Sequence, residues 1–318
     1  MNARALKEKL HSIIESKLSP LIDHDYVYWD LPYYINVGDV LIWQGTRDFL
    51  SKISYKALDF GNPTTANFKD FSIETIILLQ GGGNFGDIYG ASQSFRKKVV
   101  EKYPNNKIIV LPQTIYFEDK ANEEKDLLLF SKHENLYLCV RDQPSYEIAC
   151  RYLKEEKVLF LPDMAFCIKD QTLIKGELTS KKLLMNRVDK EAVQMNDKYI
   201  DFVDIQSDWP TFEKEPVYCV LLRYLNGLNR RINKKHSKTI LSKLIDGYAS
   251  NIVRPKLIKI GIDFINEFDT VYTTRLHGCI LSLLLDKNIV LLDNSYGKNK
   301  AFYDAWLKES DNIKVESC

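Results

Sequence analysis

Asp269-Thr270-Val271-Tyr272-Thr273-Thr274-Arg275-Leu276-His277-Gly278, near the end of this 318-residue chain, has the pattern of a short strand followed by an arginine and a histidine. Alternating apolar residues predict the strand, and Gly278 allows a tight turn into the helix expected from Cys279. Open α/β sheets bind ligands at the carboxyl ends of their strands. A fixed cation beside an imidazole suits an anion that is held while a proton moves, so Arg275 and His277 are candidate site residues. The alternative is a solvated arginine and a histidine that packs in the core.

Strand-like and helix-like runs alternate along the rest of the chain. Continuous β-branched and leucine-rich strands between helices are typical of parallel sheets covered on both faces, so the expected fold class is α/β. The expected strands cover residues 26–29, 75–79, 107–111 (ended by Pro112), 136–140, 158–161, 182–185, 217–222, 270–274 and 289–292. We expect two Rossmann-like domains, residues 1–172 and 173–318, that face a cleft in a GT-B-like manner. The last helix, residues 301–308, is free to pack back on the first domain.

Composition places the chain among soluble globular proteins, because 45% of its residues are hydrophobic and 27% are charged. The net charge of +1 gives no overall attraction to nucleic acid, so no nucleic-acid partner is expected. The N-terminus predicts an amphipathic helix rather than a signal peptide, and no apolar run reaches the ~20 residues of a membrane span. The six cysteines are scattered without a metal-binding cluster, which indicates a cytoplasmic protein without a structural zinc site.

The segment Gln80–Asp87 follows a buried strand and contains a literal GxGxxG. A dinucleotide site also needs a helix that begins at once and an acidic residue about 20 positions on. Both are missing, so NAD binding is disfavoured. The bare backbone N–H groups of such a strand end still suit a phosphate or carboxylate, which makes Gly82, Gly83 and Asn84 candidate ligand contacts. A tight turn packed under a helix explains one or two glycines better than three in a row.

Other polar residues near strand ends have ordinary structural alternatives. Asn36 and Asp39 stand where a strand passes into a helix, and capping is their default role. Arg141, Asp163 and Arg187 each follow a predicted strand, where a structural ion pair is the commoner explanation. Several cations gathered at the strand ends of both halves are less readily explained as structural ion pairs alone.

The stretch Arg223–Lys238 carries six lysines and arginines. A solvated loop is the first interpretation. The sharper interpretation is a patch that meets a diphosphate or makes a peripheral contact with an anionic membrane surface.

Taken in order, seven segments resemble the motifs of the polysaccharide pyruvyl transferase family. They are Asn36–Asp39, Leu79–Asn84, Leu111–Phe117, Val140–Ser145, Leu161–Phe166, Thr274–Gly278 and Asn294–Lys300. No single segment is decisive, and their order and spacing together carry the resemblance. One segment departs from the family, because Tyr116 stands where some members carry a histidine, so no role in proton transfer is carried over to it.

The resemblance implies a GT-B-like fold and transfer of pyruvate from phosphoenolpyruvate to two hydroxyls of a sugar, which forms a cyclic ketal. The sugar belongs to a cell-surface polysaccharide or its lipid-linked precursor, so the resemblance also implies a cytoplasmic enzyme at the inner membrane face. No metal and no other cofactor is expected.

Phosphoenolpyruvate carries a phosphate and a carboxylate, so we expect its site to contain several fixed cations. His277 is the expected acid–base residue, since imidazole titrates near neutrality, and Arg275 and Asp39 are expected to act beside it. The expected donor contacts are Arg141, Arg275, Gly82, Gly83, Asn84 and Lys300. The expected acceptor contacts are Asn36, Asp87, Gln113 and Tyr116.

Two other functions remain open on the sequence. A GT-B glycosyltransferase would bind a nucleotide sugar, although no clear acidic residue follows His277 to hold the ribose. A carbohydrate-binding or scaffold protein of an envelope assembly complex would have no use for an arginine and a histidine at a strand end.

Overall fold

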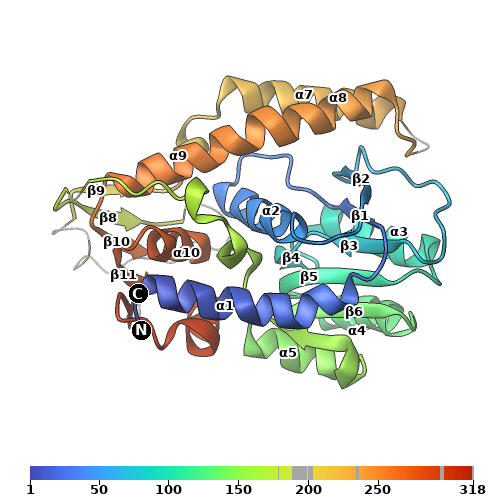
Figure 1. Cartoon of the computed structure of the whole chain (residues 1–318), viewed down its shortest axis with the longest axis horizontal. Helices are drawn as coiled ribbons and strands as arrows, with labels where there is room; N and C mark the ends of the chain where they lie inside the picture. Colours follow the sequence, from blue (N-terminus) through green and yellow to red (C-terminus); the bar gives the residue numbers. More distant parts are fainter. Residues whose placement is uncertain (178, 188–198, 200–202, 234–235, 294–296, 317–318) are drawn as a thin grey trace.

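The computed structural model describes residues 1–318 except 178, 188–198, 200–202, 234–235, 294–296 and 317–318. Its fold is mixed α/β and is built on two parallel sheets (Figure 1). The first sheet has the order β2-β1-β3-β5-β6-β7, with β4 also paired to β5. Its strands are β1 (Tyr26–Trp29), β2 (Ala57–Gly61), β3 (Ile76–Leu79), β4 (Gly82–Phe85), β5 (Ile108–Ile115), β6 (Leu136–Val140) and β7 (Val158–Phe160).

The second sheet has the order β12-β11-β10-β8-β9 and is also parallel. Its strands are β8 (Lys182–Met185), β9 (Ile205–Ser207), β10 (Thr270–Thr273), β11 (Asn288–Leu292) and β12 (Ile313–Glu316). The central strand β10 is the one predicted from the sequence quoted at the outset, and Arg275 and His277 follow its carboxyl end. The α/β fold class with parallel sheets is therefore confirmed, while the domain limits stay a prediction.

Helices cover the sheets and connect them. They are α1 (Ala3–Leu18), α2 (Val37–Leu50), α3 (Gly90–Lys102), α4 (Lys120–Ser131), α5 (Gln143–Cys150), α6 (Pro210–Glu213), α7 (Val217–Ile232), α8 (Ile240–Tyr248), α9 (Arg254–Asn266), α10 (Leu276–Leu284) and α11 (Lys298–Phe302). The short helical turns are η1 (Ser19–Leu21), η2 (Glu155–Lys157), η3 (Met164–Cys167), η4 (Asp170–Thr172), η6 (Ala249–Val253) and η7 (Tyr303–Leu307). Among the helices that the structure describes, none is long and apolar enough to span a bilayer.

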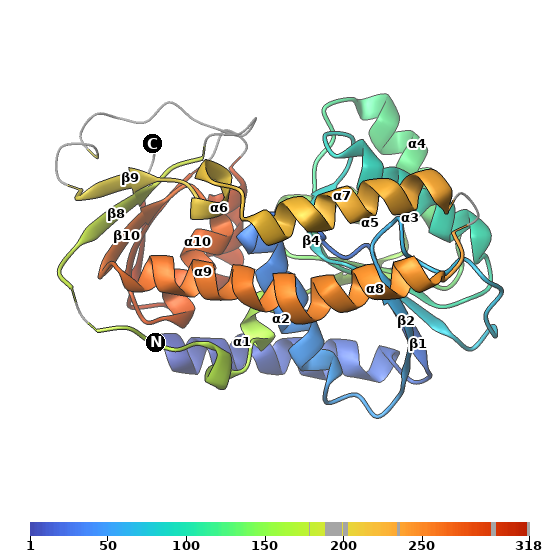
Figure 2. The same cartoon turned by 90° about the horizontal axis from the view of Figure 1, so that it is seen from above.

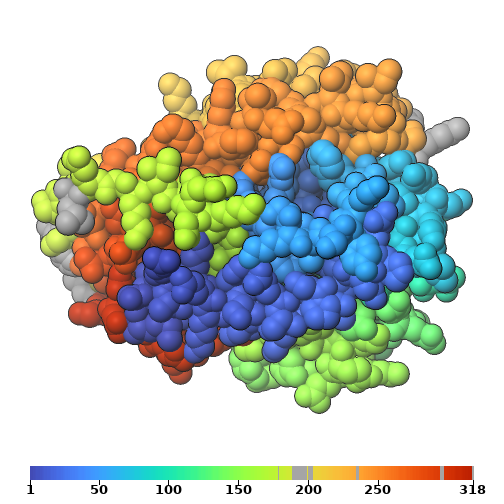
Figure 3. Space-filling model, viewed as in Figure 1, coloured from blue at the N-terminus to red at the C-terminus, as the bar shows by residue number. Residues whose placement is uncertain are grey.

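One hydrophobic core joins the two sheets through α1, α2, α9 and α10. Helix α1 contributes Leu6, Leu10 and Ile14, which repeat every fourth residue and so lie on one buried face. The helix crosses the molecular face between the two halves (Figure 3). This shared core fixes the strand ends of one sheet relative to those of the other.

The sequence-based interpretation of residues 217–222 as a strand is wrong, because they form the first turns of α7. Cys219 and Leu222 are buried three residues apart, which is helical spacing, while Val217 and Leu221 are exposed. A short continuous apolar run does not distinguish a strand from a helix by periodicity alone. The stretch Arg223–Lys238, expected as a loop, is therefore helical as far as Ile232, and its Lys234 and Lys235 lie outside the described residues.

The expected end of a strand at Pro112 is also wrong, since β5 continues to Ile115. The pairing of β5 with β6 shifts register between Val110 and Gln113, and this irregularity accommodates a proline that has no N–H to donate. Strands β2, β4, β9 and β12 were not predicted. The glycines of β4 gave no apolar pattern by which a strand could be recognised.

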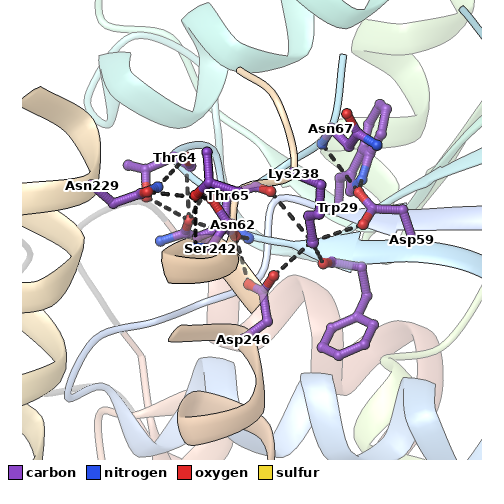
Figure 4. A network of polar contacts seen from close by, with 12 residues as sticks. Trp29, Asp59, Asn62, Thr64, Thr65, Asn67, Asn229, Lys238, Ser242 and Asp246 are labelled. Atoms are coloured by element: carbon purple, nitrogen blue, oxygen red, sulfur yellow. Dashed lines mark hydrogen bonds and ion pairs between the residues drawn. The ribbon is translucent and has the colours of Figure 1, made fainter. Parts of the chain in front are cut away.

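A buried polar network ties the α7–α8 hairpin to the first sheet (Figure 4). Lys238 lies 2.7 Å from Asp59 and 2.6 Å from Asp246. Asp246 also accepts hydrogen bonds from Tyr33 and Thr65, and the Trp29 indole donates to Asp59. Burial raises the pKa of Asp246 to about 6, against the opposing effect of Lys238.

Candidate active site between the two sheets

The carboxyl ends of strands from both sheets line a cavity of about 580 Å³. Seven of the predicted site residues lie on its wall: Asn36, Asp39, Gly83, Asn84, Arg141, Arg275 and His277. Arg187, which follows a predicted strand of the second half, lines it too. The cavity is large enough for a small anion and part of a sugar chain.

His277 faces a buried carboxylate that it shares with an arginine. Its Nε2 lies 3.4 Å from Oδ2 of Asp163, and the Arg141 guanidinium forms an ion pair with the same oxygen. The other oxygen of Asp163 accepts the backbone N–H of Ala165 at 2.8 Å. Burial alone would raise the pKa of Asp163, but the charges of His277 and Arg141 outweigh it and hold that pKa below its usual range. The carboxylate is thus kept ionised, and it orients the imidazole.

The start of α2 packs against the other side of His277. Asn36 caps this helix by accepting the backbone N–H of Gly38 at 2.9 Å, and its Nδ2 donates to Asp39 at 2.8 Å. A Cβ on Gly38 would lie 2.8 Å from Nδ1 of His277, so only glycine leaves room for the ring. Burial raises the pKa of Asp39, although the charge of His277 opposes this effect. Asp39 is therefore more basic than an exposed aspartate.

Arg275 is held by a carboxylate that the sequence did not single out. Its Nε donates to Oδ1 of Asp208 at 2.8 Å, and its Nη2 pairs with Oδ2 of the same residue. The guanidinium lies 5.0 Å from the centre of the Phe212 ring. This bidentate pair fixes the plane of a buried arginine.

The glycine segment forms β4, not a loose loop. Gly82 has a φ of +145°, which a residue with a side chain rarely adopts. Asn84 accepts hydrogen bonds on its backbone and side-chain oxygens from Arg96, which forms a buried ion pair with Asp30 at 2.7 Å. A Cβ on Gly83 would lie 3.2 Å from Nη2 of Arg141, so the backbone of Gly83 passes close to the guanidinium group. The backbone here is held by these contacts and lies close to a cation.

Five predicted site residues do not line the cavity, and Gly82, at the start of β4, is one of them. Gln113 is fully buried and donates to the carbonyl of Gln80 at 2.7 Å. Asp87 accepts the backbone N–H groups of Glu118 and Asp119 ahead of α4. Lys300 forms an exposed ion pair with Asp304 at 2.7 Å. Tyr116 is not a lining residue, although its ring lies near Nζ of Lys298, which is one.

Lys298, two residues before Lys300, lines the cavity in its place. Its Nζ lies 5.2 Å from the centre of the Tyr116 ring. The neighbouring Asn299 donates to the carbonyls of Thr274 and Leu292, both at 2.9 Å, and so ties α11 to the end of β10. A lysine-bearing tail was expected, but its pattern did not reveal which lysine turns inward.

Sequence reasoning also missed Asp208, Trp209 and Phe212. Trp209 and Phe212 line the cavity, and all three residues lie in a polar stretch without a recognisable pattern. The Trp-Pro pair at 209–210 was the only local signal. Among the residues that the structure describes, no group of three or more His, Cys, Asp or Glu side chains is arranged to hold a metal ion.

Comparison with known proteins shows which family the chain resembles in sequence. The sequence pattern of the family described as polysaccharide pyruvyl transferase matches residues 36–296. The chain is 36% identical over 310 residues to the "Putative pyruvyl transferase EpsO" of Bacillus subtilis strain 168, an alignment that covers 94% of this chain and 92% of that protein. It is 24% identical to "Pyruvyl transferase 1" of Schizosaccharomyces pombe over 87% of this chain and 68% of that protein.

A solved structure shares the fold. It is that of a functionally uncharacterised protein, KP1_0663 from Klebsiella pneumoniae, which superposes with a TM-score of 0.65 at 19% identity. The superposition covers 98% of this chain and 99% of that one. At this identity the likeness concerns the fold alone.

Proposed function

Since the chain belongs to the polysaccharide pyruvyl transferase family, we propose that it transfers pyruvate from phosphoenolpyruvate to two hydroxyls of a sugar and forms a cyclic ketal. The observation that carries the proposal is the convergence of His277, Arg141 and Arg275 on one cavity from two different sheets. A donor with two anionic groups and a carbon that must be protonated needs such a combination.

The donor anions lie in the cationic part of the cavity in this proposal. Arg275 and Arg141 come from opposite sheets, and Lys298 replaces the originally expected Lys300 as the third cation. Gly83 brings its backbone next to Arg141, and Asn84 lines the cavity after it, as suits a carboxylate or phosphate. Because Asp208 and Asp163 already fix the two guanidinium groups, little rearrangement is needed when the donor binds.

His277 gives its proton to the methylene carbon of phosphoenolpyruvate, which becomes a methyl group. The adjacent carbon then has oxocarbenium character, and a sugar hydroxyl adds to it as Asp39 accepts the hydroxyl proton. The carbon–oxygen bond to phosphate breaks, and phosphate leaves with the bonding electrons. The second hydroxyl attacks the same carbon and gives its proton to the now neutral His277, which closes the ketal ring and regenerates the acid. The proton held by Asp39 leaves with phosphate. Two C–O bonds and one C–H bond have then formed at the expense of the C=C π bond, the C–O bond to phosphate and two hydroxyl O–H bonds.

The acceptor sugar lies toward Asn36 and Asp39, with the exposed Tyr34 available to stack on its ring face. We also propose that the two halves are Rossmann-like domains, residues 1–172 and 173–318, that face a GT-B-like cleft. The acceptor is a unit of a cell-surface polysaccharide carried on a lipid, so the enzyme works at the inner face of the membrane. Gln113, Asp87 and Tyr116 support the walls of the acceptor site.

Phosphate release from phosphoenolpyruvate, measured with a panel of galactosides and N-acetylmannosaminides, tests this function. We expect release that depends on the acceptor and falls by at least about 100-fold in His277→Ala, because a general acid contributes about 10²–10⁴-fold. His24→Ala removes an exposed histidine and serves as the matched control. Binding of UDP or GDP without any phosphate release would favour a nucleotide-sugar glycosyltransferase instead.

A further inference from the structure

The α7–α8 hairpin exposes a stripe of large apolar side chains. On α7 the stripe consists of Val217, Val220, Leu221, Tyr224, Leu228 and Ile232, which are spaced three or four residues apart and so share one face. Ile240 and Leu244 extend it on α8. The exposed fractions reach 84% at Val217, 79% at Ile240 and 71% at Tyr224, which is far from the burial expected of such residues.

The opposite faces of both helices are already occupied. Cys219, Leu222 and Asn229 of α7 are buried, and Asn229 donates to the carbonyl of Thr64 at 2.7 Å. Ile245 and Asp246 of α8 are buried as well, and Asp246 belongs to the network of Figure 4. The hairpin is therefore firmly seated on the first sheet, and its outer apolar stripe is a surface rather than a loosely packed core.

The charge of the same segment is strongly one-sided. Residues 217–248 contain seven lysines and arginines and one acidic residue, so they carry +6, while the rest of the chain carries −5 and the whole chain +1. Some of these cations serve the fold, because Lys238 is turned inward and Arg223 pairs with Glu215. Arg230, Arg231 and Lys243 are exposed, and of these Arg231 follows Leu228 by three residues and Lys243 follows Ile240 by three residues, which places both on the faces that carry the stripe.

We propose that this hairpin face, the apolar stripe with Arg230, Arg231 and Lys243, docks on an anionic lipid bilayer. An amphipathic helix that combines exposed apolar residues with arginine and lysine lies in a membrane interface, with its apolar side at the acyl boundary and its cations on anionic headgroups. A second copy of the chain is a poorer partner. A symmetric dimer through this face would place its cations against the same cations of the other copy.

The docking surface begins close to the cavity. Helix α7 starts five residues after Phe212, which lines the cavity wall, and the hairpin faces the viewer in Figure 2, outermost over the molecule. Docking through this face would thus hold the end of the cavity formed by α6 near the bilayer. The proposal does not depend on pyruvyl transfer, because binding to lipid is measured without donor or acceptor.

Vesicle co-sedimentation tests the proposal. The purified chain is mixed with vesicles of phosphatidylcholine, or of phosphatidylcholine and phosphatidylglycerol, at low and high salt. We expect binding to the anionic vesicles only, weakened by salt. Arg230→Glu with Arg231→Glu should lower the partition coefficient by more than about tenfold, since two cations that attract anionic headgroups become two anions that are repelled by them. Tyr224→Ser with Ile232→Ser should lower it comparably.

Matched controls separate the hairpin face from exposure in general. Lys125→Glu with Lys314→Glu makes the same change of net charge elsewhere, and Ile73→Ser with Ile174→Ser removes two exposed isoleucines elsewhere. Both controls should bind as the wild type does, and all variants should keep its melting temperature. Absence of binding by the wild type, or unchanged binding by both hairpin variants, overturns the proposal. So does a wild-type dimer that these same hairpin substitutions convert to a monomer.

Discussion

At the scale of single residues, the position of His277 depends on the absence of a side chain at Gly38. The imidazole lies between the start of α2 and the carboxylate of Asp163, and a Cβ at Gly38 would come within 2.8 Å of its Nδ1. The geometry that orients the proposed acid is thus set by two elements from the first half of the chain, although His277 itself follows a strand of the second.

Gly38→Ala should therefore reduce kcat by about 100-fold or more, because misplacing a reacting group by about 1 Å costs that much. Overpacking should also lower the free energy of unfolding by about 1–3 kcal/mol. Gly247→Ala is the control, since its Cβ would meet nothing within 4 Å. Activity assays and urea unfolding of both variants decide the matter, and a fully active Gly38→Ala would show that the ring is not confined as described.

Asp163 should make stability depend on pH in the acid range. Its pKa is lower in the folded protein than the usual aspartate value of about 3.9. The ionised carboxylate therefore stabilises the folded protein at pH values above about 3.9. This contribution is lost as the pH falls from there toward the lower pKa of Asp163 in the folded state. Urea unfolding between neutral pH and pH ~3 should show a shallower decline for Asp163→Asn than for the wild type. Asp263→Asn changes an exposed aspartate and serves as the control, so it should behave as the wild type does. An equally steep decline of stability in Asp163→Asn would assign the acid sensitivity to other carboxylates.

The sequence was sufficient to predict the residues that directly follow strands. Arg141, Arg275 and His277 occupy positions at the sheet edge that the chain's own pattern defines, and all three line the cavity. Gln113 also follows an apolar run, but β5 continues past Pro112 and takes Gln113 into the sheet. Asp208 could not be predicted, because only the tertiary structure brings it to Arg275 across 67 residues of sequence.

At the scale of the element, α11 presents two lysines in different directions. Lys298 lines the cavity, while Lys300 pairs with Asp304 one turn further along. Lys298→Ala should raise the KM for phosphoenolpyruvate by about tenfold or more, since a hydrogen bond to a charged group contributes about 1.5–3 kcal/mol. Lys300→Ala should change it by less than about twofold, as expected for an exposed ion pair. Steady-state kinetics of the two variants compare them directly, and the reverse ranking would restore Lys300 as the donor contact.

The hairpin shows how an element can be misassigned and still be held firmly. A run of apolar letters suggested a strand at 217–222, yet half of those side chains face solvent on a helix. What anchors the hairpin is Lys238 between Asp59 and Asp246, a contact between distant segments that no local pattern contains.

Lys238→Met should destabilise the protein by about 3–5 kcal/mol, because it leaves two buried carboxylates without their cation. Lys243→Met, on the exposed side of α8, should change the free energy of unfolding by less than about 0.5 kcal/mol. Equilibrium unfolding in urea provides both values. A small effect of Lys238→Met would mean that the two carboxylates are protonated or solvated once the lysine is gone.

At the scale of the whole molecule, the two parallel sheets were predictable and their connection was not. Alternating strands and helices indicated α/β halves, and both sheets are parallel. The sequence did not indicate that α1 and the α7–α8 hairpin would each pack across from one half to the other, because such contacts join residues more than 150 positions apart. The cavity results from this assembly, since neither sheet alone supplies both His277 and its carboxylate partner.

Isotope incorporation tests the central claim, that this cavity protonates phosphoenolpyruvate and transfers its three-carbon unit to a sugar. The reaction is run in heavy water with the acceptor that supports phosphate release, and the sugar product is analysed by mass spectrometry and NMR. We predict a cyclic ketal whose methyl group carries one deuterium, formed in equal amount with phosphate, and its loss in His277→Ala. A sugar product without a ketal, or a ketal whose methyl group carries no deuterium, would contradict the account.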